Sequence, residues 1–471
     1  MMTIWCPDIS AASGPIYLAV ADAIEADIRA GVLSTGDRMP PQRELAYKLG
    51  VTLGTVTRAY REAERRRLLK GETGRGTYVA PAEIEASPLI PREERSNELD
   101  LARNFAYPHL NPNLSKGLAR VARTPGIDRL NGFVPSEGLS THRQAGAKLF
   151  DLFRLDADPS NIALTCGAQH GIQVLLQALF MPGDAVAVDE FTYPSILNSA
   201  PHLGLRLVPI PLQRDEATGD FLAMDPDALA AAARTEGVKG VFLMPNMHNP
   251  TTHTMTLEER QGLVEVARHH GLKIIEDDPY TPFVGNCPFA FGMLAPELTA
   301  SIASISKLIS PGSRIGYVHV PRAYGNTVRN LIGESTWMAS PITAELIAGW
   351  IRDGTLRRTL EKKVKANAER HRTARKILAG VPLQGADDKV FAWVGLPKGA
   401  DPVAVEASLA HQGVAVLSSR YFQVREKAPR PFLRITFGSI VGQREFEAAL
   451  MRTRDVIAQA GETRFGLGQI G

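Results

Sequence analysis

The sequence predicts a multidomain protein with a small α-rich winged helix-turn-helix unit and a large α/β domain built on a mostly parallel sheet. Three observations predict this. Residues 15–79 show helical periodicity and end in a hairpin pattern. Residues 81–97 hold three prolines and many charges, which favours an extended linker. From Leu99 onward, apolar strand-like runs alternate with amphipathic segments, which is typical of a parallel sheet covered by helices.

These changes of pattern place the domain boundaries. We assign residues 1–80 to the first unit, 81–98 to the linker and 99–471 to the second domain. Within that domain, residues 136–340 form the expected large lobe, and residues 99–135 plus 341–471 form a smaller α+β lobe. Ligands of such sheets bind at the carboxyl ends of the strands, so the site is expected there.

The N-terminal unit has the spacing of a helix-turn-helix. Apolar residues recur at helical spacing from Ile16 to Ile28, so this stretch predicts a helix with one buried face. A short helix ending at Gly50 and a second one after Thr52 follow. Thr52 is the expected N-cap, and the second helix presents Thr55, Thr57 and Arg58 while Val56, Ala59 and Tyr60 pack inward.

The basic charge of this unit favours a polyanion as partner. Residues 38–80 carry ten Lys/Arg against four Glu, a balance of +6, while the whole chain is only +3. The segment LLKGETGRGTYV predicts a hairpin whose glycine-rich tip lets backbone amides approach a phosphate chain. One basic helix alone is more often a solvated surface than a DNA reader.

The combination of these segments resembles a known family. PIY, GVLSTGDRMPPQRELAYKLGV, TVTRAY and GRGTYV are similar to the GntR-type winged helix domain over nearly its whole length. The resemblance implies that double-stranded operator DNA is the partner, and that six residues form the contact surface: Arg38, Arg43, Thr55, Thr57, Arg58 and Gly76. The segment PPQREL departs from the family, which more often has a serine after the first proline.

The spacing of the cysteines and the length of the apolar runs bear on metal sites, disulfides and membrane segments. Cys6, Cys166 and Cys287 lie far apart and match no metal or disulfide spacing, so no metal site is expected. Neither a signal peptide nor a membrane-spanning run is recognised. We therefore expect a cytoplasmic protein without a membrane partner. Cys166 is expected to be a small buried residue.

The second domain carries several short motifs whose order is informative. They are TCGAQHG around Gly167, EFTYPS with Tyr193, PNMHNPT with Asn249, IIEDDPY with Asp277 and Tyr280, SISK ending at Lys307, PGSRIGY with Arg314, and PRPFLRITFG with Arg434. In this order, the set resembles the aminotransferase class I/II family of fold-type I from about Leu99 to the C-terminus. The resemblance implies pyridoxal 5'-phosphate as cofactor.

The chemistry of that cofactor explains the residue types. Lys307 is the expected catalytic lysine, since its amine forms the Schiff base. Asp277 at a strand end would face the pyridine nitrogen, and Asp278 would point the other way. The family implies Asn249 and Tyr280 at the phenolic oxygen and Tyr193 stacked on the ring. The phosphate would bind at the turn with Gly167, Ala168 and Gln169, together with Ser304, Ser306 and Arg314.

We expect Arg434 to bind a substrate or effector carboxylate through its guanidinium. The alternative is that Arg434 is an arginine on the surface of a strand.

Three departures from the family are visible. Phe133 stands where many members have a tyrosine that reaches the partner subunit's phosphate. His248 replaces a common glutamine and is either a ligand-facing base or a packed loop histidine. Thr252 replaces a common glycine.

A helix-turn-helix joined by a linker to such a domain resembles the MocR/GabR-like regulators. The resemblance implies a head-to-tail homodimer that senses an amine or amino acid, or the cofactor itself, through aldimine exchange at Lys307. A working aminotransferase is the first alternative, because every catalytic residue type is present. A plain GntR repressor with an inactive second domain is the other, and the set of Lys307, Asp277, Asn249 and Arg314 weakens it.

Overall fold

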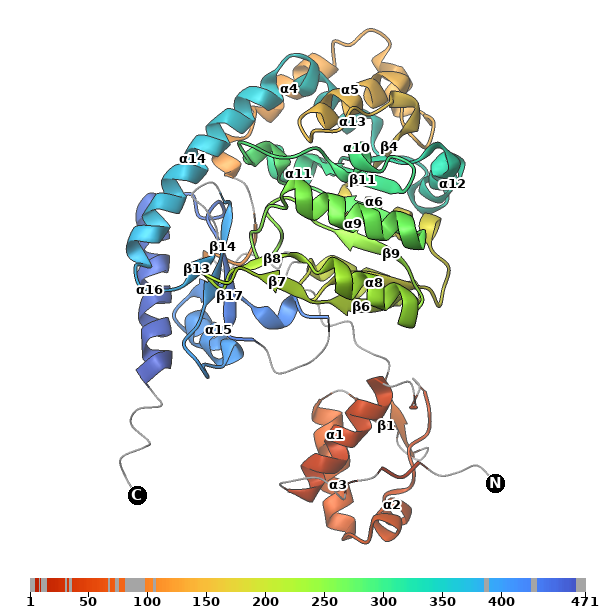
Figure 1. Cartoon of the computed structure of the whole chain (residues 1–471), viewed down its shortest axis with the longest axis vertical. Coiled ribbons are helices and arrows are strands. Elements are labelled where there is room, and N and C mark those ends of the chain that lie inside the picture. The colour runs from red at the N-terminus through yellow and green to blue at the C-terminus, as the bar shows by residue number, and fades with distance from the viewer. Residues whose placement is uncertain are drawn as a thin grey trace. The chain divides into compact units, whose positions relative to one another are not determined.

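A computed structural model of the chain describes residues 5–7, 9, 15–29, 32–33, 36–66, 68–72, 76–80, 98–104, 107–384, 389–424 and 430–462. The chain separates into two compact units, Met1–Ile90 and Pro91–Gly471 (Figure 1). The predicted linker lies outside the described residues except for Glu98. None of the helices in the described ranges is both long and apolar enough to cross a bilayer.

The first unit is a three-helix domain with a small hairpin. Its elements are α1 (Ile16–Arg29), α2 (Gln42–Leu49), α3 (Leu53–Arg65), β1 (Leu69–Glu72) and β2 (Gly76–Val79). Val20, Ile24, Leu45, Val56 and Tyr60 are buried in its core, as the helical spacing requires. The predicted helix-turn-helix and hairpin are therefore confirmed.

The turn between α2 and α3 follows from local chemistry. Gly50 ends α2 in the left-handed conformation with φ +66°, which glycine adopts without steric cost. Thr52 then caps α3, and its hydroxyl accepts a hydrogen bond from the Thr55 amide at 3.2 Å. The side chains of Val56, Ala59 and Tyr60 are buried as predicted.

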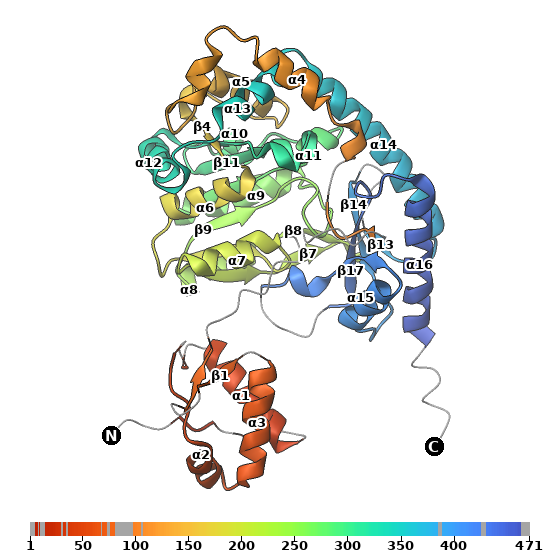
Figure 2. The ribbon, with the colours of Figure 1, turned by 180° about the vertical axis from the view of Figure 1, so that it is seen from behind.

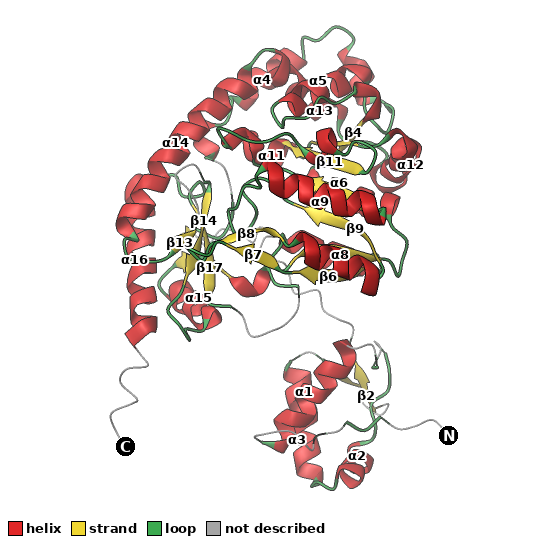
Figure 3. Ribbon diagram, in the orientation of Figure 1, coloured by secondary structure: helices red, strands yellow, loops and turns green. Residues whose placement is uncertain are grey.

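The second unit is built on a seven-stranded mixed sheet (Figure 3). Its order is β4 (Ile162–Thr165), β12 (Gly316–His319), β11 (Thr299–Ser304), β10 (Lys273–Asp277), β9 (Val238–Leu243), β5 (Ala185–Asp189) and β6 (Arg206–Ile210). Strand β12 runs antiparallel to both of its neighbours, and the other pairs are parallel. The predicted mostly parallel sheet is confirmed.

Each face of this sheet has its own apolar core. Along β5, Val186 and Val188 belong to one core while Ala185 and Ala187 belong to the other. Strands buried on both faces read as continuous apolar runs, which is why the sequence shows no alternation there. The first face is covered by α6 (Ala168–Leu179), α7 (Pro194–His202) and α12 (Gly325–Thr336), and the second by α8 (Pro226–Thr235), α9 (Leu257–His270) and α10 (Phe291–Leu294).

The C-terminal part forms a smaller α+β lobe, seen from behind in Figure 2. Its sheet has the order β13 (Leu383–Gln384), β14 (Phe391–Gly395), β17 (Phe432–Thr436) and β16 (Leu417–Ser418). Strand β3 (Leu99–Asp100) pairs with β15 (Val414–Ala415), so the first residues of this unit join its last part. The lobe also contains α14 (Thr355–Ile377), α15 (Pro402–His411) and α16 (Gln443–Glu462).

The remaining elements connect or flank these sheets. They are α4 (Leu114–Val121), α5 (Ser140–Asp151), α11 (Ile305–Leu308), α13 (Pro341–Arg352), the hairpin β7 (Leu212–Arg214) and β8 (Phe221–Met224), and the short 3₁₀ turns of the second unit, at Pro108–Leu110, Ile127–Asn131, Pro159–Asn161, Thr281–Phe283, Pro311–Ser313, Arg322–Tyr324 and Ser419–Tyr421. The short helix α11 follows β11 directly and carries Lys307. The carboxyl ends of β10 and β11 therefore bring Asp277 and Lys307 to one edge of the large sheet.

Candidate functional site

Lys307, the expected catalytic lysine, lies on the one-turn helix α11. Ser304 caps this helix, and its hydroxyl accepts from the Ser306 amide at 3.2 Å. The Lys307 ammonium donates to the backbone carbonyl of Asn104 at 2.7 Å. No carboxylate forms an ion pair with it among the described residues, so its nitrogen is held only by a neutral acceptor.

At the carboxyl end of β10, the neighbouring side chains of Asp277 and Asp278 point to opposite faces of the sheet. Asp278 accepts from Asn246 at 2.7 Å and from the amides of Tyr280 and Thr281 at 3.1 and 3.0 Å. Asp277 is 3% exposed, and its carboxylate accepts no hydrogen bond from the part of the chain that the structure describes. Asp278 is therefore a structural carboxylate, while Asp277 keeps its oxygens available, as the strand alternation predicts.

Burial and mutual charge set the ionisation of this site. Burial, followed by the charge of Asp278, raises the pKa of Asp277 to about 7, while the Lys307 ammonium acts in the opposite direction. Burial and the nearby Arg434 lower the pKa of Lys307 to about 8, against the pull of Asp277. Asp277 and Lys307 thus interact electrostatically, and the pKa values of both lie near neutral pH.

Arg434 is a buried cation on β17 whose hydrogen-bond acceptors are neutral oxygens. Its guanidinium donates to the Asn249 amide oxygen at 3.1 Å and to the backbone carbonyl of Ala102. Its Nε has no acceptor among the described residues. Burial lowers the pKa of Arg434 to about 10, which leaves it charged at pH 7. The side chain is 1% exposed, so the expected alternative of a surface arginine is wrong.

Two tyrosines complete the inner wall of the site. The Tyr280 hydroxyl accepts from the Asn104 side-chain amide at 2.8 Å. Burial raises the pKa of both Tyr193 and Tyr280, and the charges of Asp277 and Arg434 act on each of them. The structure therefore brings together the predicted residues Tyr193, Tyr280 and Asp277 around Lys307 and Arg434.

The amino end of α6 forms a cradle of backbone amides. Gly167 precedes it with φ +81°, and a Cβ there would lie 2.8 Å from the Arg314 guanidinium. A Cβ on Gly316 would lie 3.0 Å from the Ala168 nitrogen, so only glycine allows this close approach. Arg314 donates to the Cys166 carbonyl at 2.8 Å. The Gln169 side chain instead turns to Ser199 at 3.0 Å, which leaves its backbone amide as the group facing the cradle.

Sequence reasoning missed two parts of the site. Asn104 contacts both Lys307 and Tyr280 from more than 170 positions away, and no motif marks it. Asp189 lies 3.2 Å from His248, and neither of its carboxylate oxygens has a hydrogen-bond partner among the described residues. His248 also contacts the Thr251 hydroxyl at 2.8 Å. The histidine is 3% exposed, which fits a packed loop residue.

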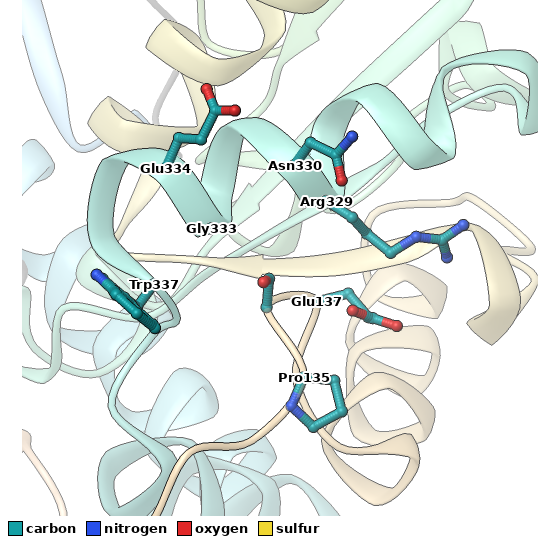
Figure 4. A pocket seen from close by; sticks show the side chains of 8 residues that line it. Pro135, Glu137, Arg329, Asn330, Gly333, Glu334 and Trp337 are labelled. Atoms are coloured by element: carbon teal, nitrogen blue, oxygen red, sulfur yellow. The ribbon is translucent and has the colours of Figure 1, made fainter.

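The other departures from the expected pattern have distinct surroundings. Cys166 is half-buried rather than buried, so that expectation is wrong. Thr252 adopts φ +70° and is buried at the position where glycine was expected. Phe133 is 79% exposed and packs against Trp337, with ring centroids 5.0 Å apart and ring planes tilted by 32°. Trp337 also lines an open cavity of about 820 Å³ with Glu334 and Pro135 (Figure 4), and Lys307 is not among the residues that line this cavity.

These residues fit pyridoxal 5'-phosphate. Asp277 is a buried carboxylate without a donor among the described residues and suits a protonated ring nitrogen, and the glycine-lined end of α6 suits a phosphate. Arg434 keeps an unsatisfied nitrogen for a carboxylate. Without a bound group, these buried charges are compensated only by hydrogen bonds to neutral oxygens and by the attraction between Asp277 and Lys307.

In the first unit, the predicted DNA contacts lie on α2, on α3, on β2 of the hairpin and, for Arg38, on the segment before α2 that bridges to Tyr78 of β2. Arg38, Arg43 and Arg58 are exposed, and a Cβ on Gly76 would lie 3.1 Å from the Arg38 side chain. The hydroxyls of Thr55 and Thr57 make contacts at 2.9 Å to Thr52 and 2.8 Å to Gln42. Arg66, by contrast, pairs with Glu25 and Glu62, so the net charge overstates the free basic surface.

The buried Asp277 makes stability depend on pH. Its folded pKa lies above the value of an unfolded aspartate, so ionising it in the folded cofactor-free protein costs stability as pH rises from about 4 to about 7. We expect Asp277→Asn to raise the melting temperature of the cofactor-free protein by several degrees at pH 8 and to change it little at pH 4.5. Thermal unfolding at both pH values measures this, and an equal shift at both would contradict it.

Comparison with known proteins agrees with this description. The family model "Aminotransferase class I and II" matches residues 106–452, and "Bacterial regulatory proteins, gntR family" matches residues 16–79. An archaeal alanine:glyoxylate aminotransferase superposes with a TM-score of 0.70 at 22% identity, covering 77% of this chain and 91% of that one. LysN, an α-aminoadipate aminotransferase from Thermus thermophilus complexed with N-(5'-phosphopyridoxyl)-L-leucine, gives 0.69 at 20% identity over 78% and 93%. These structures show the fold.

Full-length relatives share both parts of the chain. The uncharacterised HTH-type transcriptional regulator YdeF of Bacillus subtilis is 29% identical over 96% of each chain. The vitamin B6 salvage pathway transcriptional repressor PtsJ of Salmonella typhimurium is 28% identical over 89% of this chain and 94% of its own. The predicted pairing of a GntR-type domain with an aminotransferase-like domain is confirmed, and the chain belongs to the aminotransferase class I and II family, with a gntR-family domain at its N-terminus.

Proposed function

We propose that this protein is a DNA-binding transcription regulator whose aminotransferase-like domain holds pyridoxal 5'-phosphate at Lys307 and senses an amine or amino acid. The observation that carries the proposal is the union, in one chain, of a gntR-family domain and a buried site that keeps Lys307, Asp277 and Arg434. The relatives YdeF and PtsJ, whose names describe transcriptional regulators, cover nearly the whole chain and support it.

Each site residue has a definite task in this proposal. When bound, the cofactor supplies an aldehyde carbon that joins an amine and a ring that withdraws electrons from it. Lys307 provides the nitrogen of attachment, and its pKa near 8 leaves part of it unprotonated at neutral pH. Asp277 holds the ring nitrogen, and the amides of Ala168 and Gln169 with Arg314, Ser304 and Ser306 hold the phosphate.

Arg434 would select the effector. Its charge is buried against the neutral oxygens of Ala102 and Asn249, and its Nε still lacks an acceptor among the described residues. A carboxylate would supply the missing acceptor and an opposite charge in direct contact with the guanidinium. An amino acid could therefore present its amine toward Lys307 and its carboxylate toward Arg434.

Assembly and location complete the proposal. We propose a head-to-tail homodimer in which the exposed Phe133–Trp337 pair faces the partner, because large exposed aromatic rings mark contact surfaces. Phe133 cannot donate a hydrogen bond to a partner's phosphate as a tyrosine would. Binding of effector and DNA would be coupled reciprocally. We place the protein in the cytoplasm, where its DNA would be.

The second candidate is a working aminotransferase. The complete set of Lys307, Asp277, Asn249 and Arg434 around one site favours it. Turnover with panels of amines and keto acids, measured beside DNA titration on the gene's own upstream sequence, separates the two. Tight DNA binding that changes with cofactor, together with negligible turnover, supports the regulator, and rapid turnover without DNA binding contradicts it.

Replacing Lys307 tests the cofactor assignment. We expect Lys307→Ala to lose the visible absorbance of the lysine-linked cofactor and its response to added amines, because no nitrogen remains for attachment. Lys365→Ala, an exposed change on α14, is the control and should absorb like the wild type. Absorbance titration measures both. If Lys307→Ala keeps the same chromophore, the assignment is wrong.

Two arginine variants test the DNA surface. We expect Arg43→Ala and Arg58→Ala each to weaken operator binding about tenfold, since one base or phosphate contact contributes about 1–3 kcal/mol. Cofactor absorbance should not change. Arg65→Ala is the matched control, because Arg65 lies on α3 but pairs with Glu62 at 2.7 Å. Gel-shift titration at fixed salt measures all three, and wild-type affinity in both test variants would remove these residues from the surface.

A further inference from the structure

His170 is a buried imidazole in the first turn of α6, next to the cradle of backbone amides. Its side chain is 8% exposed. Its Nδ1 accepts a hydrogen bond from the Cys166 backbone amide at 3.1 Å, and its Nε2 lies 2.8 Å from the Ser335 hydroxyl of α12. None of the tasks assigned to the cofactor-holding residues involves this histidine.

The partners of the imidazole fix the position of its proton. A backbone N–H can only donate, so Nδ1 carries the lone pair and Nε2 carries the hydrogen of the neutral ring. Nε2 then donates to the Ser335 oxygen, and the Ser335 hydroxyl donates to the Leu331 carbonyl at 2.7 Å. Burial, followed by the charge of Arg314, lowers the pKa of His170, which keeps the ring neutral at pH 7. The donors from Cys166 to Leu331 therefore all point the same way.

His170 and Arg314 hold the two peptide groups on either side of the Cys166 Cα. The imidazole binds the amide of the peptide before this Cα, and the Arg314 guanidinium binds the carbonyl of the peptide after it at 2.8 Å. Because each peptide group is planar, holding both of them restrains φ and ψ of Cys166. Gly167 follows with φ +81° and leads the chain into α6. The direction of the first amides of α6 therefore depends on both side chains.

The turn separates amides that the protein uses from amides that are left for a ligand. The Cys166 amide is bound by His170, and the Gly167 amide donates to the Thr165 carbonyl at 2.8 Å. The next two amides, at positions 168 and 169, have no acceptor in the described part of the chain, as is usual at the start of a helix. The contact with His170 lies directly before the amides that face the cradle.

We propose that His170 is a positioning residue for the cofactor phosphate: through the Cys166 amide, it fixes the turn that presents the first amides of α6. This inference rests on the proposed function, because the phosphate is assigned to this cradle there. The side chain must offer an acceptor to Cys166 and a donor to Ser335, and neutral histidine offers both. Hydrogen bonds behind the side chains that bind a metal ion influence metal affinity in the same indirect way.

Binding of two ligands that differ only in the phosphate tests this role. The full-length protein, freed of cofactor, is titrated with pyridoxal 5'-phosphate and with pyridoxal, and visible absorbance gives each dissociation constant. We expect His170→Leu to weaken binding of pyridoxal 5'-phosphate about tenfold, the loss typical of one hydrogen bond left unmade, and to change binding of pyridoxal less than about twofold. His170→Gln, whose amide offers both an acceptor and a donor, should restore most of the lost affinity.

A second variant and a control complete the test. Ser335→Ala leaves the Cys166 contact in place but removes the acceptor that orients the ring, so we expect a smaller loss, about threefold, again only for the ligand with the phosphate. His269→Leu, an exposed change on α9 at the opposite face of the sheet, should bind both ligands as the wild type does. Melting temperatures check that each variant is folded, and the phosphorus resonance of the bound cofactor should shift in His170→Leu and not in His269→Leu.

The outcomes separate this inference from the proposed function. Wild-type affinity for pyridoxal 5'-phosphate in folded His170→Leu, or an equal loss of affinity for both ligands, would overturn the role of His170 and leave the cofactor assignment intact. If His170→Leu does not fold, unchanged affinity in Ser335→Ala would overturn it in the same way. A wild-type protein that binds no pyridoxal 5'-phosphate would overturn the cofactor assignment itself, together with this inference.

Discussion

The functional site of the second domain depends on three ionisable groups that are largely removed from water where the large and small sheets meet. Lys307, Asp277 and Arg434 come from three different strands or strand ends, and each has a pKa shifted by burial. Transfer of such groups from water costs several kcal/mol unless they are paired. In this site, the groups that contact Lys307 and Arg434 are mainly neutral oxygens. Burying these groups therefore costs free energy of folding, and the resulting site is complementary to a charged ligand.

The same constraint ties distant segments together. The segment 98–104 supplies the Asn104 carbonyl to Lys307 and the Ala102 carbonyl to Arg434. Glu190, next to the end of β5, pairs with Arg430 at 2.6 Å, and the Thr192 amide donates to the Phe422 carbonyl at 2.8 Å. Arg434 thus lies on β17 beside contacts that join the end of β5 to the small lobe.

Much of the fold was readable from local patterns. The helix from Ile16, the Gly50 turn and the Thr52 cap follow from periodicity and capping chemistry, which involve only neighbouring residues. Lys307 after an apolar strand and Gly167 before a helix were likewise recognisable from short motifs. The basic count of residues 38–80 was less informative, because Arg66 is neutralised by Glu25 and Glu62. Net charge records composition and does not record pairing.

The sequence by itself determined the two-part layout, the order of strands and helices, and the residue types that the cofactor chemistry needs. Each depends on spacing along the chain, where neighbouring residues dictate the geometry. Only the tertiary structure decided that Asp278 is saturated with hydrogen bonds while Asp277 is not, and that Arg434 is buried rather than exposed. It also brought Asn104 to Lys307 across more than 200 positions. These contacts join residues whose separation in sequence carries no signal, so packing alone fixes them.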